Sequence, residues 1–191
     1  MYEFKPFPNM VSILCPCCQK EAQFCFVVIV PIHKKEDISY FQKRKDFRYE
    51  RFISRGVVWH AAVYFPGLIH TEPTSIQDLP QGYCPQKLAH PRYLKEHQDY
   101  PWGTLTCSHC VLSKKHKLHW PQDAYYHITY KGDRLWAFDR QMFLSIHQLI
   151  ASTQRSKIEN ANYFLRFIPK QFLAAKARST ICSRIEKRLK H

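Results

Sequence analysis

Two pairs of cysteines, each with the spacing Cys-x-x-Cys, constrain this chain more than any other feature. The first pair is Cys15 and Cys18, the second is Cys107 and Cys110, and 88 residues separate them. A Cys-x-x-Cys turn directs two thiolates toward one point, and two such turns complete the tetrahedral site in which proteins hold structural zinc. We therefore predict one structural Zn²⁺ ion that ties the start of the chain to its middle.

The long separation between the pairs is the main objection to this site. Closing a loop of that length costs about 4–5 kcal/mol of chain entropy. Binding of a structural zinc ion contributes about 10–16 kcal/mol at neutral pH. The ion outweighs the entropy, particularly where the intervening segment 19–106 forms strands of its own.

A local site on the second pair is the first alternative. It combines Cys107 and Cys110 with His116 and His119, in the order of zinc-finger ligands. The chain between Cys110 and His116 is too short for the hairpin and helix of a finger. Either histidine nevertheless remains able to replace one of the four cysteines.

Two further alternatives concern the first pair. Cys-Pro-x-Cys also occurs in glutaredoxin-like redox dithiols, where a helix follows the motif, whereas the apolar run after Gln19 indicates a strand. In the other alternative, Cys17 replaces one of its neighbours as a ligand. The remaining cysteines are expected to be buried small apolar residues or bystanders: Cys25, Cys84 and Cys182.

The residues of both pairs resemble the zinc-ribbon class, whose turns commonly read Cys-Pro-x-Cys, as Cys15-Pro16-Cys17-Cys18 does. The resemblance covers only the two turns and their flanking strands, and it implies a structural zinc ion. Turns of this class often have glycine directly after the second cysteine, where this chain has Gln19 and Val111. Zinc ribbons occur in nucleic-acid-binding proteins, adaptors and enzymes alike, so the resemblance implies no single function.

Hydrophobic patterning predicts an α+β fold with a long β-rich and irregular insert between the pairs. Strands are expected at 23–31, 40–53 and 57–65, where β-branched and aromatic residues are frequent. Six prolines from Pro66 to Pro101 predict an irregular excursion over 66–103.

The second half of the chain is predicted to be a hairpin followed by helices. The hairpin runs from Tyr125 to Phe138, and Asp139 is placed to cap a helix that ends near Ala151. Pro169 suits the first turn of a last, basic helix over about 170–189. We expect one zinc-stabilised domain over 1–151 and a helical segment over 152–191 packed on it or extending from it.

Composition favours a globular protein that keeps its thiols reduced. The longest apolar run, Phe24 to Ile32, is too short to cross a bilayer, and the N-terminus lacks the pattern of a secretory signal. Eight cysteines are few for a disulfide scaffold of 191 residues. We therefore expect a cytoplasmic protein.

The net charge of +14 is concentrated in the second half of the chain. Residues 106–191 contain 16 lysines and arginines and only 5 acids. Such asymmetry indicates a polyanionic partner, and we predict DNA or RNA, bound largely through its backbone. The candidate contact residues are Lys43, Arg44, Lys45, Arg48, Lys114, Lys115, Lys117, Lys170, Lys176, Arg178, Arg184, Lys187 and Arg188.

Catalytic motifs are missing from the chain. There is no His-Glu-x-x-His of zinc proteases, and no His-x-Glu precedes a Pro-Cys-x-x-Cys of zinc deaminases. Zinc held by four thiolates has no open position for water. His60 is a possible general base but fits a sheet-face histidine better. We predict a non-enzymatic binding module, with a protein-interaction adaptor using 66–103 as the alternative and a hydrolase or nuclease as the outlier.

Overall fold

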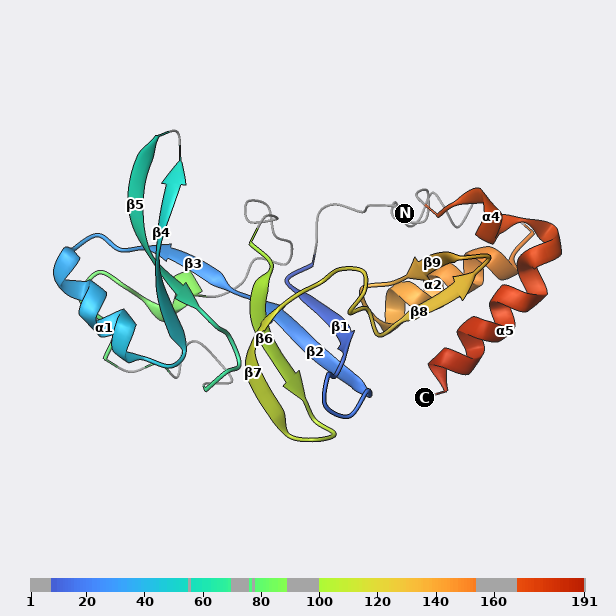
Figure 1. The fold of residues 1–191 in the computed structure, drawn as a ribbon, viewed down its shortest axis with the longest axis horizontal. Coiled ribbons are helices and arrows are strands. Elements are labelled where there is room, and N and C mark those ends of the chain that lie inside the picture. The colour runs from blue at the N-terminus through green and yellow to red at the C-terminus, as the bar shows by residue number, and fades with distance from the viewer. Residues whose placement is uncertain are drawn as a thin grey trace.

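The strands that the structure describes form three antiparallel sheets, which follow one another along the longest axis of the protein (Figure 1). The computed structural model describes residues 8–54, 56–69, 76, 78–88, 100–153 and 168–190. A three-stranded sheet lies at one end of these residues, a four-stranded sheet in the middle, and a two-stranded hairpin with helices at the other end. Both helices and strands are present, as the patterning predicts.

The central sheet contains both cysteine pairs. Its strands have the order β1-β2-β6-β7, and their bounds are Met10–Leu14, Glu21–Phe26, Trp102–Cys107 and Leu112–Lys117. Alternation places Phe24 and Leu105, which are opposite one another on β2 and β6, in the main core with no exposed surface. The opposite face carries Gln23 and Thr106.

The apolar run predicted as one strand over 23–31 belongs to two different sheets. β2 ends at Phe26, and β3 (Val28–Pro31) pairs with β5 (Val57–Tyr64) in the three-stranded sheet β3-β5-β4. Between them, Val27 donates its N–H to the carbonyl of Trp102 at 3.2 Å. The prediction of a single strand was wrong because both halves are equally apolar and the sequence pattern does not show which partner each half meets.

The strand predicted over 40–53 begins later than its aromatic residues indicate. Residues Lys35–Asp37 form the 3₁₀ helix η1, Ile38–Lys43 form the helix α1, and β4 covers Phe47–Ser54. Helix α1 buries Phe41 against Phe47, with ring centroids 5.1 Å apart. Packing of this buried ring against the sheet stabilises a helix of about one and a half turns. Tertiary packing therefore overrides the strand-like composition of the segment.

The proline-rich excursion lies only partly in the described residues. There it forms the 3₁₀ helix η3 (Pro85–Leu88), and β6 begins at Trp102, inside the predicted irregular segment. Residues 70–75, 77 and 89–99 lie outside the described residues.

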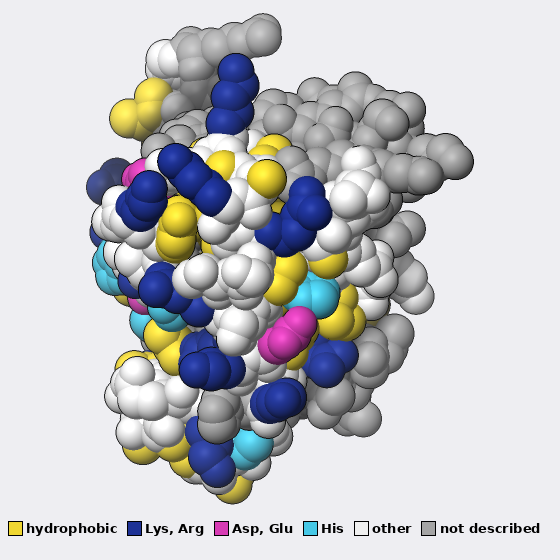
Figure 2. Space-filling view, turned by 90° about the vertical axis from the view of Figure 1, so that its right-hand side faces the viewer, with side chains coloured by type: hydrophobic (Ala, Val, Ile, Leu, Met, Phe, Trp, Pro, Cys, Tyr) yellow, Lys and Arg dark blue, Asp and Glu magenta, His cyan; other side chains and the backbone are white. Residues whose placement is uncertain are grey.

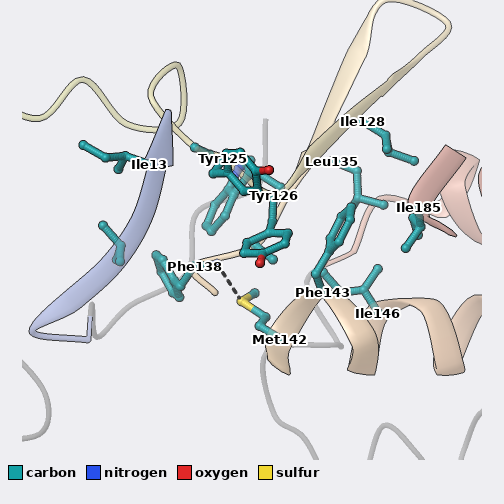
Figure 3. Close-up of a cluster of buried hydrophobic side chains, with 14 of the residues drawn as sticks. Ile13, Tyr125, Tyr126, Ile128, Leu135, Phe138, Met142, Phe143, Ile146 and Ile185 are labelled. Atoms are coloured by element: carbon teal, nitrogen blue, oxygen red, sulfur yellow. Dashed lines mark hydrogen bonds between the residues drawn. The ribbon is translucent and has the colours of Figure 1, made fainter. Parts of the chain in front are cut away.

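The predicted hairpin and the capped helix after it are confirmed. Strands β8 (His127–Tyr130) and β9 (Asp133–Trp136) pair across Lys131 and Gly132, which both have positive φ, as the tight turn of a hairpin requires. Helix α2 (Arg140–Ala151) presents Phe143 and Ile146 to the main core. Figure 3 shows these side chains between β1, the hairpin and Ile185 of the last helix.

The last helix is interrupted rather than continuous over 170–189. Lys170–Leu173 form α4, Ala175–Ala177 form the 3₁₀ helix η5, and Arg178–Leu189 form α5. Ala174 is extended, with φ −64° and ψ 135°. The interruption allows Phe172 of α4 and Ile181 of α5 to be fully buried in the same core, and this packing decides the local conformation.

Asp139→Ala is expected to destabilise the protein by about 1 kcal/mol, because the carboxylate of Asp139 accepts the N–H of Met142 at 2.7 Å and caps α2. Urea denaturation followed by circular dichroism measures the change. Asp139→Asn is the matched control and should retain most of the stability, since asparagine caps equally well. Equal losses in the two variants would contradict the capping role.

Candidate metal centre

Topology alone brings the two Cys-x-x-Cys turns together. Cys15 to Cys18 form the turn between β1 and β2, and Cys107 to Cys110 form the turn between β6 and β7. Because β2 and β6 are antiparallel neighbours, the start of β2 and the end of β6 lie at the same end of the sheet. The chain leaves β2 after Phe26 and enters β6 at Trp102, at the end of these strands opposite to the cysteine turns.

The four sulfur atoms lie in a cluster of the size that one metal ion requires. Cys15 Sγ is 3.5 Å from Cys110 Sγ, and Cys18 Sγ is 3.6 Å from Cys107 Sγ. All four atoms lie within 4.8 Å of one another. A tetrahedral zinc with bonds of about 2.3 Å would have sulfurs about 3.8 Å apart. The cysteines therefore form a cluster that is able to hold a metal ion.

Backbone conformation is the same in both turns. Gln19 has φ 60° and Val111 has φ 56°, although neither residue is glycine. Each follows the second cysteine of its pair, at the position where zinc-ribbon turns often have glycine. The left-handed conformation costs roughly 1 kcal/mol for such residues, so the clustered cysteines have to compensate for it.

Backbone N–H groups in both turns point at the sulfurs. Those of Cys17 and Cys18 donate to Cys15, that of Lys20 donates to Cys18, and that of Leu112 donates to Cys110. Donors in this arrangement stabilise negative sulfur. Both turns are thus built to hold thiolates rather than thiols.

The pKa values of the thiols differ within the cluster. Burial acts to raise the pKa of Cys15, but the two backbone N–H groups and the nearby sulfurs lower it to about 7. Burial and the neighbouring sulfurs raise the pKa of Cys110, and burial with the nearby thiols outweighs the Lys20 N–H to raise the pKa of Cys18. One thiolate forms readily, and further ones require a positive charge at the centre.

The histidines of the local alternative do not join the cluster. His116 Nε2 lies 3.2 Å from Asp123 Oδ2, and the backbone N–H of His119 donates to the same oxygen at 2.8 Å. Within the described part of the chain, the metal-sized group contains the four cysteines and no histidine. Cys17 is exposed and outside the group, and the strand β2 follows Cys18, where a redox dithiol would have a helix.

A hollow of about 600 Å³ opens beside the second turn, on the polar face of the central sheet. Gln23, Thr106 and His109 are among the residues that line it. Glu21 also lines it, but its two carboxylate oxygens accept hydrogen bonds from Ser12 and Tyr126, both at 2.8 Å. Among the described residues that line it, none is a lysine or arginine that would attract a phosphate.

Two arginines of the first predicted nucleic-acid segment are engaged within the fold. Arg44 donates to both oxygens of Asp46 at 2.9 and 2.7 Å. Arg48 pairs with Glu50 at 2.7 Å, and its guanidinium lies 4.4 Å from the centre of the Trp102 ring. Lys43 and Lys45 are exposed.

The predicted lysines of β7 also include one that is engaged within the fold and two that are exposed. Lys115 donates to the carbonyl of Phe47 at 3.0 Å, and burial followed by the nearby Arg48 lowers its pKa. This lysine connects the central sheet to the three-stranded sheet. Lys114 and Lys117 are exposed.

Cations gather on the helices α4, η5 and α5, a surface that we call the basic face (Figure 2). Residues 168–190 contain seven lysines and arginines and one acid, Glu186, which pairs with His147 at 3.0 Å. Arg188 donates to the carbonyl of Tyr125 at 2.8 Å, and Arg184 donates to that of Thr129. The exposed lysines of the face have no hydrogen-bond or ion-pair partner among the described residues: Lys170, Lys176, Lys187 and Lys190.

His60, the candidate general base, lies in β5 against a tyrosine. Its Nδ1 is 2.7 Å from the hydroxyl of Tyr49, and the two rings are stacked with centroids 5.8 Å apart. This cross-strand pair stabilises the β4–β5 hairpin. The contact gives His60 a structural partner on the sheet.

Comparisons with protein-family models, curated proteins and solved structures find no match for this chain. In the described residues, every helix is too short or too polar to cross a lipid bilayer. The cysteine cluster and the basic face are therefore the features of the molecule that bear on function.

Proposed function

We propose that this chain is a non-enzymatic, zinc-stabilised module that binds DNA or RNA largely through the phosphate backbone, in the reducing environment of the cytoplasm. The observation that carries the proposal is the basic face, where four lysines are exposed and unpaired among the described residues. In this proposal zinc stabilises the fold, and the exposed lysines bind the phosphates of the nucleic acid.

Zinc is the metal that suits the cysteine cluster best. Four thiolates in a tetrahedral arrangement select zinc or iron, and a closed four-sulfur site holds zinc in a structural role. The sulfur contacts of 3.5 and 3.6 Å are close to the edge of such a tetrahedron. A zinc-ribbon arrangement of two hairpin turns agrees with the positive φ at Gln19 and Val111.

The free lysines of the basic face favour a polyanionic ligand. A lysine that already pairs with a carboxylate loses that partner when it binds a phosphate, whereas an unpaired lysine exchanges only solvent and counterions. Arg184 and Arg188 of the face fix the helices in place through carbonyls of the β8–β9 region. The face thus combines a fixed scaffold with available charge.

Neutralising three lysines of the basic face should weaken nucleic-acid binding and reduce its salt dependence. In the variant Lys170→Gln/Lys176→Gln/Lys187→Gln, the slope of log K against log salt should fall by about 2.7 on duplex DNA, since each phosphate contact contributes about 0.9. Fluorescence anisotropy with labelled DNA and RNA between about 50 and 200 mM salt measures the slope.

The matched control changes the same net charge elsewhere. Lys20, Lys34 and Lys35 are exposed and lie outside the basic face, so replacing them with glutamine should leave the slope nearly unchanged. An equal fall in both variants would mean that the charge acts without a defined surface. If the wild-type protein does not bind either nucleic acid at about 50 mM salt, the proposed function is rejected.

A further inference from the structure

The hairpin of β4 and β5 extends beyond the sheet that anchors it. β3 pairs with β5 only from Ala61 to Tyr64, so residues 51–54 and 57–60 form a two-stranded ribbon that no third strand of the described residues joins. Figure 1 shows this ribbon, which we call the arm, projecting from the body of the protein. At the base of the arm, Ile32 donates its N–H to the carbonyl of His60 at 2.8 Å.

The tip of the arm is apolar and exposed. Ile53, Val57 and Val58 have 75%, 66% and 53% of their surface exposed, and they account for three of the six exposed large hydrophobic residues in the described part of the chain. Ile53 lies directly opposite Val58 across the two strands. Apolar side chains gathered at the end of a projection indicate a binding surface.

The stem of the arm is stiffened on both faces by ring contacts. Phe52 and Trp59 are stacked on one face, with centroids 5.0 Å apart and an angle of 25°. Tyr49 and His60 are stacked and hydrogen-bonded on the other face. These pairs hold the tip in position before any ligand arrives, which reduces the entropy lost on binding.

The charge on the arm favours an anionic ligand. Arg51 is exposed, and no described residue forms a hydrogen bond or ion pair with it. The carboxylate of Glu50 is paired with Arg48. Arg51 and Ile53 lie on the same face of β4, about 7 Å apart along the strand. One free cation thus lies directly behind an apolar tip.

The chemistry of the tip decides how it would meet nucleic acid. Side chains of isoleucine and valine have no hydrogen-bonding groups, so they do not read base edges. Apolar side chains do insert between base pairs from the minor groove of DNA, where they unstack one step and kink the duplex. The minor groove of A-form RNA is wide and shallow and does not offer this arrangement.

We propose that the arm inserts Ile53, Val57 and Val58 as a wedge between adjacent base pairs of duplex DNA, with Arg51 on a flanking phosphate. This inference rests on the proposed function and narrows it to duplex DNA. The arm and the basic face lie toward opposite ends of the long axis (Figure 1), so the wedge and the basic face are tested separately. Insertion without base reading gives a preference for DNA that is already easy to kink.

The test compares the wild-type protein with Ile53→Ser/Val57→Ser/Val58→Ser on two duplexes of about 25 base pairs, one intact and one with a central mismatch. The wild type should prefer the mismatched duplex by about tenfold and should raise the fluorescence of 2-aminopurine beside it, because the wedge unstacks a step that is already weak. The triple variant should lose both effects and keep the salt slope. Ile69→Ser, at a residue 54% exposed and outside the arm, is the control and should behave as wild type.

The outcomes separate this inference from the proposed function. Salt-dependent binding with equal affinity for both duplexes and no unstacking would overturn the wedge and leave the basic face intact. Absence of binding at about 50 mM salt would overturn both. Sedimentation with vesicles of phosphatidylcholine and phosphatidylserine that disappears in the triple variant, without unstacking of DNA, would assign the tip to a membrane surface and also overturn the wedge.

Discussion

Cys15→Ser is expected to purify without a bound metal ion and to melt well below the wild type. A serine hydroxyl does not replace a thiolate on zinc, and Cys15 is fully buried in the cluster. Without the ion, the cost of about 4–5 kcal/mol for closing the loop between the pairs is no longer offset. At about 2–4 °C per kcal/mol for a protein of this size, the melting temperature should fall by roughly 10–20 °C.

Elemental analysis of the purified proteins and thermal melting by circular dichroism measure both effects. Cys17→Ser is the matched control, because Cys17 is exposed, lies in the same turn and is outside the cluster. It should retain one zinc per chain and the wild-type melting temperature. A Cys15→Ser protein that retained its metal and its stability would show that the four cysteines are not the ligand set. Iron in place of zinc would keep the site and change the metal.

The cysteine cluster was predictable from the sequence because its signal is local. Two thiols three residues apart need only a tight turn, and the apolar residues after the first turn indicate the strand β2, whereas β7 is polar except for Leu112. The antiparallel pairing of β2 with β6, which brings the turns to the same end, is not written in either turn. The left-handed conformation of Gln19 and Val111 was predictable only from their position, where zinc-ribbon turns often have glycine. Their residue types give no indication of it.

The division of the first apolar run between two sheets was not predictable in the same way. Phe26 pairs with a residue of β6, and Val28 pairs with a residue of β5. Both residues are apolar, so the exchange of partner at Val27 leaves no mark in the hydrophobic pattern. The strands that pair with each half of the run lie tens of residues away in the chain. A single sequence does not show which half pairs with which strand.

The position of the positive charge along the chain was easier to predict than the contacts that the charged side chains make. The basic C-terminal end is visible by counting, but the carbonyls that Arg184 and Arg188 bind belong to a hairpin more than 50 residues earlier. Arg44 and Asp46 are close in sequence and opposite in charge, so their ion pair was predictable from the sequence. The apolar tip had a signal too: Val57 and Val58 are consecutive, so one of them faces away from any single core.

Gly103→Ala is expected to destabilise the protein by about 3 kcal/mol or more, because overpacking beside a backbone group has no easy relief. Gly103 lies in β6 between Phe26 and His116. A Cβ atom there would lie 2.2 Å from the carbonyl oxygen of Cys25 and 2.4 Å from Cζ of Phe24, whose ring is fully buried. The glycine thus allows β2 and its core ring to approach β6, near the end of the strand opposite to Cys107.

Urea denaturation of Gly103→Ala measures the loss, and Gly67→Ala is the control. Gly67 has φ +75° and open space around its Cβ position, so its replacement should cost only about 1–2 kcal/mol of backbone strain. Adding Phe24→Leu to Gly103→Ala should not restore stability, because the nearer obstacle is a backbone oxygen that no side-chain change removes. Restoration by that second substitution would show that the ring alone requires the glycine. A cost no larger than that of Gly67→Ala would mean that β2 and β6 separate freely at this point, and that the sheet is a looser support for the cysteine turns than its register indicates.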